Sequence, residues 1–417
     1  MDIWHIRGGN RLEGACFVQG SKNASLPIIA ASIICPLRSE LLNVPQLKDV
    51  DAALRILRHL GCQAEQRGGD VYIDSTALSG SSIPHSLMEE MRSSVIFMGA
   101  LIARCGEARL SLPGGCQLGK RPIDLHLAAL RQMGAEIEED GGEIYCRASA
   151  LRGAEISLPF PSVGATENIM LAACRAKGTT VIHGAAREPE IVALQNYLKA
   201  MGADIRGAGS STVTVSGLHP QTSVVQRIIP DRIVAATIAC AAAAAGGNVE
   251  LRGVDPEQFS TVIHFLKQAG CDIISTKRSV RLISDGRLQG VGELSTAPYP
   301  GFPTDAQPVL MAALLKAEGK TVITENIFEN RYRQIPELRR LGADINTYGK
   351  IAEIWGVDCL HGAPLTSTDL RGGAAMIVAG LAAEGETVIC DDGHIRRGYE
   401  RFDMCLRSLG ADIYLEY

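Results

Sequence analysis

The sequence predicts an α/β protein of two domains, each built from three copies of a repeated unit. The first observation is length, because 417 residues exceed what a single hydrophobic core usually fills. The second is composition: 46% of the residues are apolar but only 5% are aromatic, which favours helices packed on sheets over an aromatic-rich β-sandwich. The third is a pattern that recurs six times along the chain.

Each copy of this pattern is an apolar helix end followed by glycine, a small residue and usually an acid, and then a short strand. Glycine suits the position because the residue after a helix often takes a left-handed conformation, which costs glycine no steric strain. The six glycines lie 73, 68, 68, 72 and 68 residues apart. They are Gly61, Gly134, Gly202, Gly270, Gly342 and Gly410.

Two kinds of helix are expected in each unit. The segment before each glycine is amphipathic: residues 51–60 place apolar side chains three and four positions apart, and Pro336 suits a first helical turn. A second, upstream segment is almost wholly apolar and leads to a short strand, as in residues 169–178, 309–319 and 376–385. The apolar helices should be buried, and the amphipathic ones should lie outside.

Six units suggest two domains of three units each. The expected boundary lies near Pro230, so that residues 22–229 form one domain. A strand-like stub precedes the first unit, and we expect it to complete the second domain, residues 1–21 plus 230–417. The chain would then cross between the domains near Lys22 and near Pro230. Ligands commonly bind in a cleft between two such lobes, and we expect the active site there.

Charge and local composition argue against several classes of protein. The net charge is -5 and the basic residues are dispersed, so no nucleic-acid partner is expected. The start of the chain does not resemble a signal peptide, and the longest apolar stretch, residues 233–245, is too short for a membrane span. We therefore expect a cytoplasmic protein that does not insert into the membrane, with a core helix at residues 233–245.

Twelve cysteines are present, and no Cys-x-x-Cys pair occurs among them. A zinc site and disulfides are therefore not expected, and eleven cysteines are interpreted as reduced, buried small hydrophobes. Cys116 is the exception, because the glycines and proline of Pro113-Gly114-Gly115-Cys116 predict an exposed loop. Lys120 and Arg121 follow, and nearby cations favour a thiolate. We interpret Cys116 as a reactive thiol; the alternative is a harmless exposed one.

Further polar residues favour a site for a small anion. Lys22 and Asn23 follow a glycine at the expected crossing, where lysine supplies a point charge. Asp305 stands before an apolar helix, and on local evidence it is a helix cap. Arginine can bind carboxylate and phosphate oxygens in pairs. Arg331, Arg371 and Arg397 fall in loops of the second half, and taken singly each is interpreted as a surface residue. Together with Lys22, Arg92 and Arg121 they suggest a site for a small anion.

These motifs resemble those of the UDP-N-acetylglucosamine 1-carboxyvinyltransferase family of enolpyruvyl transferases. The resemblance runs essentially end to end, and its most specific part is the Gly-Gly-Cys116 loop with Arg121-Pro122. Shorter matching segments are residues 21–24, 162–166, 186–191, 302–305, 328–331, 368–371 and 397–400. The resemblance implies an inside-out α/β barrel in each of two lobes, with three units per lobe, which agrees with the six-fold pattern.

The resemblance also implies a reaction. The enolpyruvyl group of phosphoenolpyruvate would move to the 3-hydroxyl of UDP-N-acetylglucosamine with release of phosphate, in the first committed step of peptidoglycan synthesis. No metal or organic cofactor is implied, and the partners would be these two small molecules. Alkylation of Cys116 by the antibiotic fosfomycin is expected by the same analogy. The sequence does not indicate an oligomeric state.

Residue roles follow from the resemblance. Cys116 would be the general acid at C3 of phosphoenolpyruvate, and Asp305 would accept the proton of the sugar hydroxyl in place of its capping role. Lys22, Arg121 and Arg397 would hold phosphate, while Asn23 would contact the reacting centre. The carboxylate of phosphoenolpyruvate would be positioned by Arg92, Arg331 and Arg371. The nucleotide sugar would be held by Arg121, Pro122, Ile123, Asp124, Leu125, Ser162, Val163, Gly164 and the backbone of Ile327.

Two positions depart from the family pattern. Ser21 stands where alanine is commonest, which leans towards the related 5-enolpyruvylshikimate-3-phosphate synthases. Arg396 stands where an aspartate often precedes the key arginine, and its charge beside Arg397 would strengthen anion binding or disturb local pairing. The alternatives are therefore a synthase of that shikimate type, which does not need Cys116, or a catalytically silent paralogue that binds nucleotide sugar.

Overall fold

The computed structural model describes residues 1–91, 93–111 and 123–417. Arg92, Cys116, Arg121 and Pro122, which the sequence analysis assigns to the site, lie outside the described residues. The chain divides into two compact units. Unit 1 contains residues 1–19 and 230–417, and unit 2 contains the described residues between 20 and 229. Each unit has its own hydrophobic core.

The strands of the described residues form six four-stranded sheets that share one pattern. In each sheet one edge strand is parallel to its neighbour, and the other two neighbouring pairs are antiparallel. This shared pattern gives the repeat seen in the sequence a structural basis. Three of the sheets come from one continuous unit each, and the other three each take one strand from a distant part of the chain, residues 2–7, 12–17 or 223–227.

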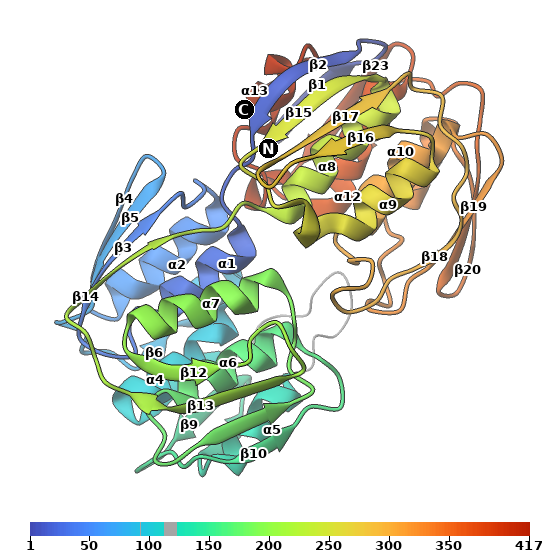
Figure 1. The fold of residues 1–417 in the computed structure, drawn as a ribbon. Coiled ribbons are helices and arrows are strands. Elements are labelled where there is room, and N and C mark those ends of the chain that lie inside the picture. Colours follow the sequence, from blue (N-terminus) through green and yellow to red (C-terminus); the bar gives the residue numbers. More distant parts are fainter. Residues whose placement is uncertain (92, 112–122) are drawn as a thin grey trace. The chain divides into compact units, whose positions relative to one another are not determined.

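Three of these sheets belong to unit 2 (Figure 1). The first, in spatial order, is β14 (Ser223–Arg227), β3 (Arg38–Leu42), β5 (Asp70–Asp74) and β4 (Gln63–Arg67). The second is β6 (Ser82–Ile83), β7 (Glu107–Ser111), β9 (Glu143–Arg147) and β8 (Glu136–Asp140). The third is β10 (Glu155–Ser157), β11 (Thr180–His183), β13 (Thr212–Leu218) and β12 (Ala203–Arg206).

The other three sheets belong to unit 1, and two of them use the N-terminal strands. One is β16 (Asp272–Ser275), β17 (Ser279–Ser284), β15 (Gly247–Arg252) and β2 (Leu12–Phe17). The next is β18 (Gly292–Ser295), β19 (Lys320–Thr324), β21 (Ile351–Trp355) and β20 (Asp344–Tyr348). The last is β22 (Pro364–Thr366), β23 (Glu386–Asp391), β1 (Asp2–Arg7) and β24 (Asp412–Glu416).

Apolar helices fill the inside of each unit, with the sheets around them (Figure 1). In unit 1 the three inner helices pack against one another: α8 (Arg232–Ala245), α10 (Gln307–Ala313) and α12 (Leu370–Ala382). In unit 2 they are α1 (Lys22–Ala31), α4 (Phe97–Cys105) and α6 (Val163–Ala173). These helices are almost wholly buried, as predicted, because none of them has a polar face to leave in water. The predicted fold class, helices enclosed by sheets in two three-unit bodies, is confirmed.

A second set of helices lies towards the outside. It comprises α2 (Lys48–His59), α3 (His85–Glu90), α5 (Asp124–Gln132), α7 (Pro189–Ala200), α9 (Ser260–Gln268), α11 (Ile335–Arg340) and α13 (Phe402–Ser408). On α7 the outward face is narrow, since only Asn196, Lys199 and Ala200 are exposed. Contacts with α1, β12 and β14 cover the rest of that helix.

The six predicted helix-ending glycines have the expected backbone. Their φ values lie between 92° and 103°, the left-handed region in which a side chain would be strained. A strand follows each glycine within two residues, from β4 after Gly61 to β24 after Gly410. The glycine repeat therefore marks six equivalent helix-to-strand turns.

The eleven described cysteines are free, but they are not all buried. Seven of them are core residues, as expected. The interpretation is wrong for Cys105, which is exposed, and for Cys359, Cys390 and Cys405, which are partly exposed. The sequence does not show this difference because it depends on which residues of other segments cover each thiol.

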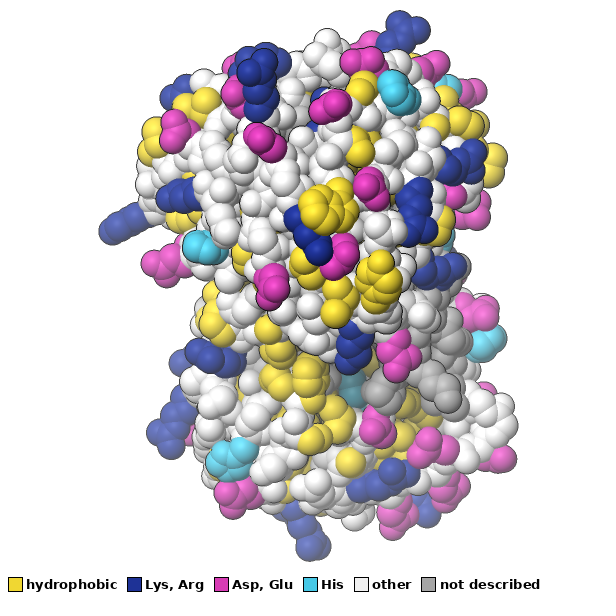
Figure 2. Space-filling model, turned by 90° about the vertical axis from the view of Figure 1, so that its right-hand side faces the viewer, with side chains coloured by type: hydrophobic (Ala, Val, Ile, Leu, Met, Phe, Trp, Pro, Cys, Tyr) yellow, Lys and Arg dark blue, Asp and Glu magenta, His cyan; other side chains and the backbone are white. Residues whose placement is uncertain are grey.

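The surface carries charges of both signs. On the face shown in Figure 2, acidic and basic side chains alternate, and neither sign forms an extended patch. This agrees with the dispersed basic residues of the sequence. Among the helices of the described residues, none is long and apolar enough to cross a membrane.

Candidate active site

Asp305 is the centre of an ion-pair cluster in unit 1. Nη2 of Arg331 donates to its Oδ1 at 2.9 Å, and Nη2 of Arg371 donates to its Oδ2 at 3.1 Å. The cap interpretation of Asp305 is wrong, because α10 begins after Ala306 without a side-chain cap. The carboxylate is instead held by two guanidinium groups through charge-assisted hydrogen bonds, which are stronger than those between neutral groups.

The two arginines of this cluster are core residues. Arg331 and Arg371 are 2% and 3% exposed, so their interpretation as surface residues is wrong. Arg331 also donates from Nε and Nη2 to the carbonyl of Thr304, and this fixes the backbone next to Asp305. Buried charges are retained where they are paired and hydrogen-bonded, which is the case for both side chains.

Tyr399 extends the cluster towards the last predicted arginine. Its hydroxyl accepts from Nη1 of Arg371 at 3.2 Å and lies 2.9 Å from Oγ1 of Thr237 in α8. Burial raises the pKa of Tyr399 despite the opposing effect of Arg371, so the phenol stays protonated at neutral pH. Arg397 is half-buried two residues before Tyr399, in the short turn Ile395–Arg397. The predicted residues Asp305, Arg331 and Arg371 are therefore in contact, and Tyr399 connects them to the Arg397 segment.

Glu325 orders the loop that contains Ile327. Its Oε1 accepts from the backbone N–H groups of Ile327 at 2.8 Å and Phe328 at 3.1 Å. Thr304 Oγ1 donates to both carboxylate oxygens, at 3.1 and 3.0 Å. Glu325 is 1% exposed and joins the residue before Asp305 to the predicted nucleotide-binding backbone. None of the sequence motifs marks Glu325 as a site residue, and the only local signal is an acid directly after a predicted strand.

In unit 2, Lys22 opens helix α1. Its Nζ lies 3.3 Å from Oδ2 of Asp49, and both side chains are largely buried. Ser21 is the N-cap of this helix and accepts from the N–H of Ala24 at 3.2 Å. Asn23 follows Lys22 and is half-buried. A capped helix start with a cation is a favourable place for an anion, because the unpaired N–H groups and the helix dipole add to the charge.

Two predicted nucleotide-binding segments meet around His126. Ile123, Asp124 and Leu125 stand at the start of α5, and His126 follows them. Ser162 is the N-cap of α6, with Val163 and Gly164 in its first turn. A Cβ on Gly164 would lie 3.0 Å from Cε1 of His126, so the glycine allows this close approach. The structure therefore brings these two segments together.

His126 is a neutral, buried link. The side-chain amide of Asn168 in α6 donates to its Nδ1 at 2.7 Å. Burial lowers the pKa of His126 to about 4, against a smaller opposing effect of Asp124. Asn168 also accepts from the N–H of Gly99 in α4 at 2.7 Å. One hydrogen-bond chain thus joins three helices beneath the predicted nucleotide site.

Several of the predicted site residues lie at the N-terminal ends of inner helices. Lys22, Gly164 and Arg371 lie in the first turns of α1, α6 and α12, and Asp305 stands just before α10. Asp369 caps α12 by accepting from the N–H groups of Arg371 and Gly372. Each unit therefore presents capped helix starts, which favour anionic groups, together with charged side chains.

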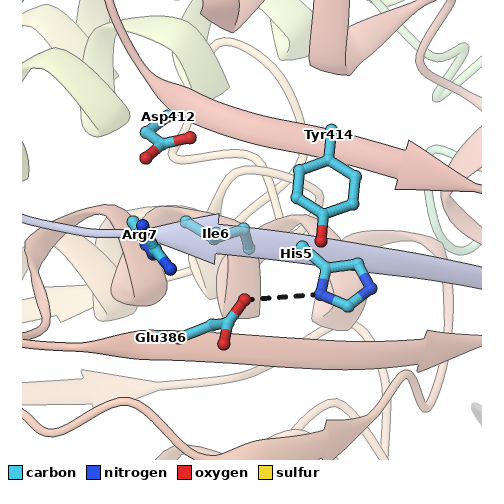
Figure 3. Close-up of a pocket in the computed structure, with 6 residues that line it drawn as sticks. All are labelled: His5, Ile6, Arg7, Glu386, Asp412 and Tyr414. Carbon is cyan, nitrogen blue, oxygen red and sulfur yellow. Dashed lines mark ion pairs between the residues drawn. The ribbon is translucent and has the colours of Figure 1, made fainter.

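A shallow hollow on unit 1 involves none of the predicted site residues. It lies on the outer face of the sheet that contains β1, β23 and β24 (Figure 3). His5 stands between Glu386 and Glu416, at 3.5 and 3.4 Å, and stacks on the ring of Tyr414. Arg7 and Asp412 complete the lining of the hollow. The hollow is a surface feature of the sheet rather than a candidate substrate site.

Sequence comparisons decide the family. The chain matches the family EPSP synthase (3-phosphoshikimate 1-carboxyvinyltransferase) over residues 6–406. UDP-N-acetylglucosamine 1-carboxyvinyltransferase 2 of Caldanaerobacter subterraneus is 48% identical over 413 residues, which cover 99% of both chains. The enzyme of Zymomonas mobilis with the name UDP-N-acetylglucosamine 1-carboxyvinyltransferase is 46% identical, again over 99% of both chains. The chain belongs to the UDP-N-acetylglucosamine 1-carboxyvinyltransferase family. It is an enzyme of the transferase class.

Solved structures support the fold. The enolpyruvyl transferase NikO from Streptomyces tendae has a TM-score of 0.90 at 26% identity, over 99% of this chain and 98% of that chain. EPSP synthase from Acinetobacter baumannii has a TM-score of 0.77 at 22% identity, over the full length of both chains. The second likeness shows the shared fold alone.

The structure accounts for both departures from the family pattern. Ser21 supplies the cap of the helix that begins with Lys22, a role that an alanine cannot fill. Arg396 Nη1 lies 3.5 Å from Oδ1 of Asp2, and its guanidinium stands 5.1 Å from the ring centre of Tyr417. The extra charge of Arg396 is thus engaged by the two ends of the chain.

Proposed function

We propose that this enzyme transfers the enolpyruvyl group of phosphoenolpyruvate to the 3-hydroxyl of UDP-N-acetylglucosamine and releases phosphate. The observation that carries the proposal is the identity of 43–48% over nearly the whole chain to relatives named for this reaction. EPSP synthase from Acinetobacter baumannii, by contrast, is 22% identical. The proposed product commits UDP-N-acetylglucosamine to peptidoglycan synthesis, and we place the reaction in the cytoplasm.

The proposed reaction has two steps. The sugar oxygen forms a bond to C2 of phosphoenolpyruvate while a proton is added to C3, which gives a tetrahedral intermediate. A proton then leaves C3 as the bond between C2 and the phosphate oxygen breaks, which restores the enol double bond. Negative charge on phosphate and carboxylate persists throughout, so fixed cations and helix starts stabilise every state.

Cys116 is the proposed donor of the proton to C3, and Asp305 the proposed acceptor of the hydroxyl proton. Each oxygen of Asp305 already accepts one hydrogen bond from an arginine. A carboxylate has about four lone-pair sites, and this side chain is 30% exposed, so a hydroxyl can approach it. We expect the two guanidinium groups to hold the carboxylate in one orientation for that approach.

The proposed phosphate ligands are Lys22, Arg121 and Arg397. The carboxylate of phosphoenolpyruvate would be positioned by Arg92, Arg331 and Arg371. Asn23 is the proposed contact of the reacting centre. The nucleotide sugar would contact the starts of α5 and α6 and the loop that contains Ile327. The residues proposed for this contact are Arg121, Pro122, Ile123, Asp124, Leu125, Ser162, Val163, Gly164 and Ile327.

Phosphate release tests the proposal directly. Purified enzyme is given phosphoenolpyruvate with either UDP-N-acetylglucosamine or shikimate 3-phosphate, and free phosphate is measured over time. Release with the nucleotide sugar alone, lost in Cys116→Ala, is the expected result. Release with the shikimate alone would replace the proposed function with that of an EPSP synthase. No release with either acceptor, together with intact nucleotide-sugar binding, would indicate a silent paralogue.

A further inference from the structure

A cysteine, a histidine and a glutamate come together in the last repeat of unit 1. The loop between β21 and β22 contains Cys359 and His361, and Glu384 lies in the turn between α12 and β23. One side-chain ligand atom from each residue lies within 4.8 Å of the other two. Sulfur, imidazole nitrogen and carboxylate oxygen are the three kinds of ligand that zinc takes in proteins.

The distances suit a single small cation. Sγ of Cys359 lies 3.9 Å from Nδ1 of His361. In a tetrahedral zinc site, a sulfur and a nitrogen ligand stand about 3.6 Å apart, given the usual bond lengths. Cys359 is partly exposed, whereas His361 and Glu384 are exposed. Small side-chain rotations are therefore enough to close the three ligands on one ion, and solvent can supply the fourth.

The backbone fixes the three residues relative to one another. The N–H of Glu384 donates to the carbonyl of Leu360 at 2.7 Å, and the N–H of Gly362 donates to the carbonyl of Glu384 at 2.7 Å. The N–H of His361 is bonded to the carbonyl of Leu341 at 2.8 Å. Leu360, between the two ligands, is fully buried and anchors the loop. A preorganised set of ligands loses less entropy when it binds a metal ion.

Comparison of the repeated units shows that the backbone arrangement recurs, whereas the three ligand side chains do not. An isolated parallel β-bridge joins His361 to Glu384. Bridges of the same kind join Arg152 to Lys177 and Gln289 to Glu318 in two other units. The side-chain amide of Gln289 donates to the carboxylate of Glu318 at 3.2 Å. Arg287, two residues before Gln289, occupies the position that corresponds to Cys359. The fold therefore requires the bridge but not these side chains, and only the last of these three bridges has a thiol, an imidazole and a carboxylate.

The surrounding charges are mixed. Partial desolvation and the Glu384 carboxylate raise the pKa of Cys359, and Lys316 opposes this effect. The ammonium group of Lys316 donates to the carbonyl of Ala382 at 3.3 Å. The thiol therefore keeps its proton in the metal-free protein, and a bound cation would release it.

We propose that Cys359, His361 and Glu384 form a binding site for a thiophilic divalent cation of the zinc type. The site is independent of the proposed transferase reaction, for which no metal is invoked. It revises the expectation, based on the missing Cys-x-x-Cys pair, that the chain has no zinc site. A Cys-x-His pair with a distant glutamate supplies the ligands instead.

Cobalt(II) is the probe, because thiolate ligation gives a charge-transfer absorption in the near ultraviolet that carboxylate or imidazole ligation does not. The full-length protein, kept reduced without a chelator, is titrated with cobalt(II) and then with zinc(II). We expect one equivalent of cobalt to give the absorption and zinc to remove it. Cys359→Ser should abolish the absorption, and His361→Gln or Glu384→Gln should weaken binding at least tenfold.

Matched control variants are Cys105→Ser, which removes another exposed thiol, and His219→Gln, which removes an exposed histidine of another unit. Both should bind cobalt as the unaltered protein does. Circular dichroism checks that each variant is folded, which the exposure of these side chains favours. Absence of the absorption in the unaltered protein at millimolar cobalt would overturn the proposal. So would an absorption that survives Cys359→Ser and disappears in Cys116→Ala.

Discussion

Asp305 and Arg371 are 66 residues apart in the chain, and Nη2 of Arg371 donates to Oδ2 of Asp305 at 3.1 Å. The same guanidinium donates to the hydroxyl of Tyr399 from Nη1. One planar group thus orients the proposed base and ties it to the segment of Arg397. Because lysine has a single ammonium group, it keeps the charge at this position but not the geometry.

Replacement of Arg371 by lysine should lower kcat/KM by about tenfold to a hundredfold, since a hydrogen bond to a charged group contributes about 1.5–3 kcal/mol. Phosphate release at varied phosphoenolpyruvate measures the loss. Arg340→Lys, at an exposed site on α11, is the matched control and should leave kcat/KM unchanged. Equal activity of the two variants would contradict the positioning role of Arg371.

Glu325 should affect nucleotide-sugar binding more than phosphoenolpyruvate binding. Glu325→Ala removes the acceptor of two loop N–H groups and of Thr304, all of which are partly buried. Loss of these hydrogen bonds should destabilise the ordered loop by about 1–3 kcal/mol. We therefore expect KM for UDP-N-acetylglucosamine to rise by about tenfold. Steady-state kinetics with each substrate varied in turn measures the effect. Glu293→Gln, an exposed acid on β18, should behave as the unaltered enzyme.

His126 should make stability fall in mild acid. Its pKa is about 4 in the folded protein, lower than the usual value of about 6.5 for an unfolded chain. Between these values the unfolded state binds the extra proton, so the free energy of unfolding decreases as the pH falls from 6.5 towards 4. The loss is about 3 kcal/mol at most. Urea unfolding at pH 7, 5.5 and 4.5 should show a shallower pH dependence for His126→Gln than for the unaltered protein.

Gly164→Ala should disturb the helix start beside His126. The new Cβ would lie 3.0 Å from Cε1 and 3.3 Å from Nε2 of a buried ring, which must shift. Such overpacking costs about 1–3 kcal/mol, and we expect weaker nucleotide-sugar binding as well. Thermal unfolding and calorimetric titration with UDP-N-acetylglucosamine test both effects. Gly69→Ala, where the added Cβ meets nothing within 4 Å, is the control.

Fosfomycin should inactivate the enzyme through the thiol of Cys116, as the family resemblance implies. Alkylation adds one inhibitor to the protein, which intact-mass spectrometry detects, and peptide mapping locates it. Cys116→Ala should remain unmodified under the same conditions. Modification at Cys105 or Cys359 in place of Cys116 would count against the reactive-thiol interpretation, because both are accessible to reagents.

The sequence by itself determined the repeat and the fold class. Glycine at the six helix ends is a local requirement of backbone conformation, and wholly apolar segments must be buried wherever they lie. Lys22, Asp305 and Arg371 were also identifiable as residue types in motifs. Such features depend on neighbours within a few residues, so they can be read along the chain.

Only the tertiary structure decided which side chains meet. Asp305 was read locally as a cap, and its pairing with Arg331 and Arg371 depends on contacts across 26 and 66 residues. The burial of those arginines and the neutral state of His126 depend on helices packed from other parts of the chain. The same holds for Cys359, His361 and Glu384, which the fold brings together from two loops. Pairing and desolvation are properties of three-dimensional packing, and no local pattern encodes them.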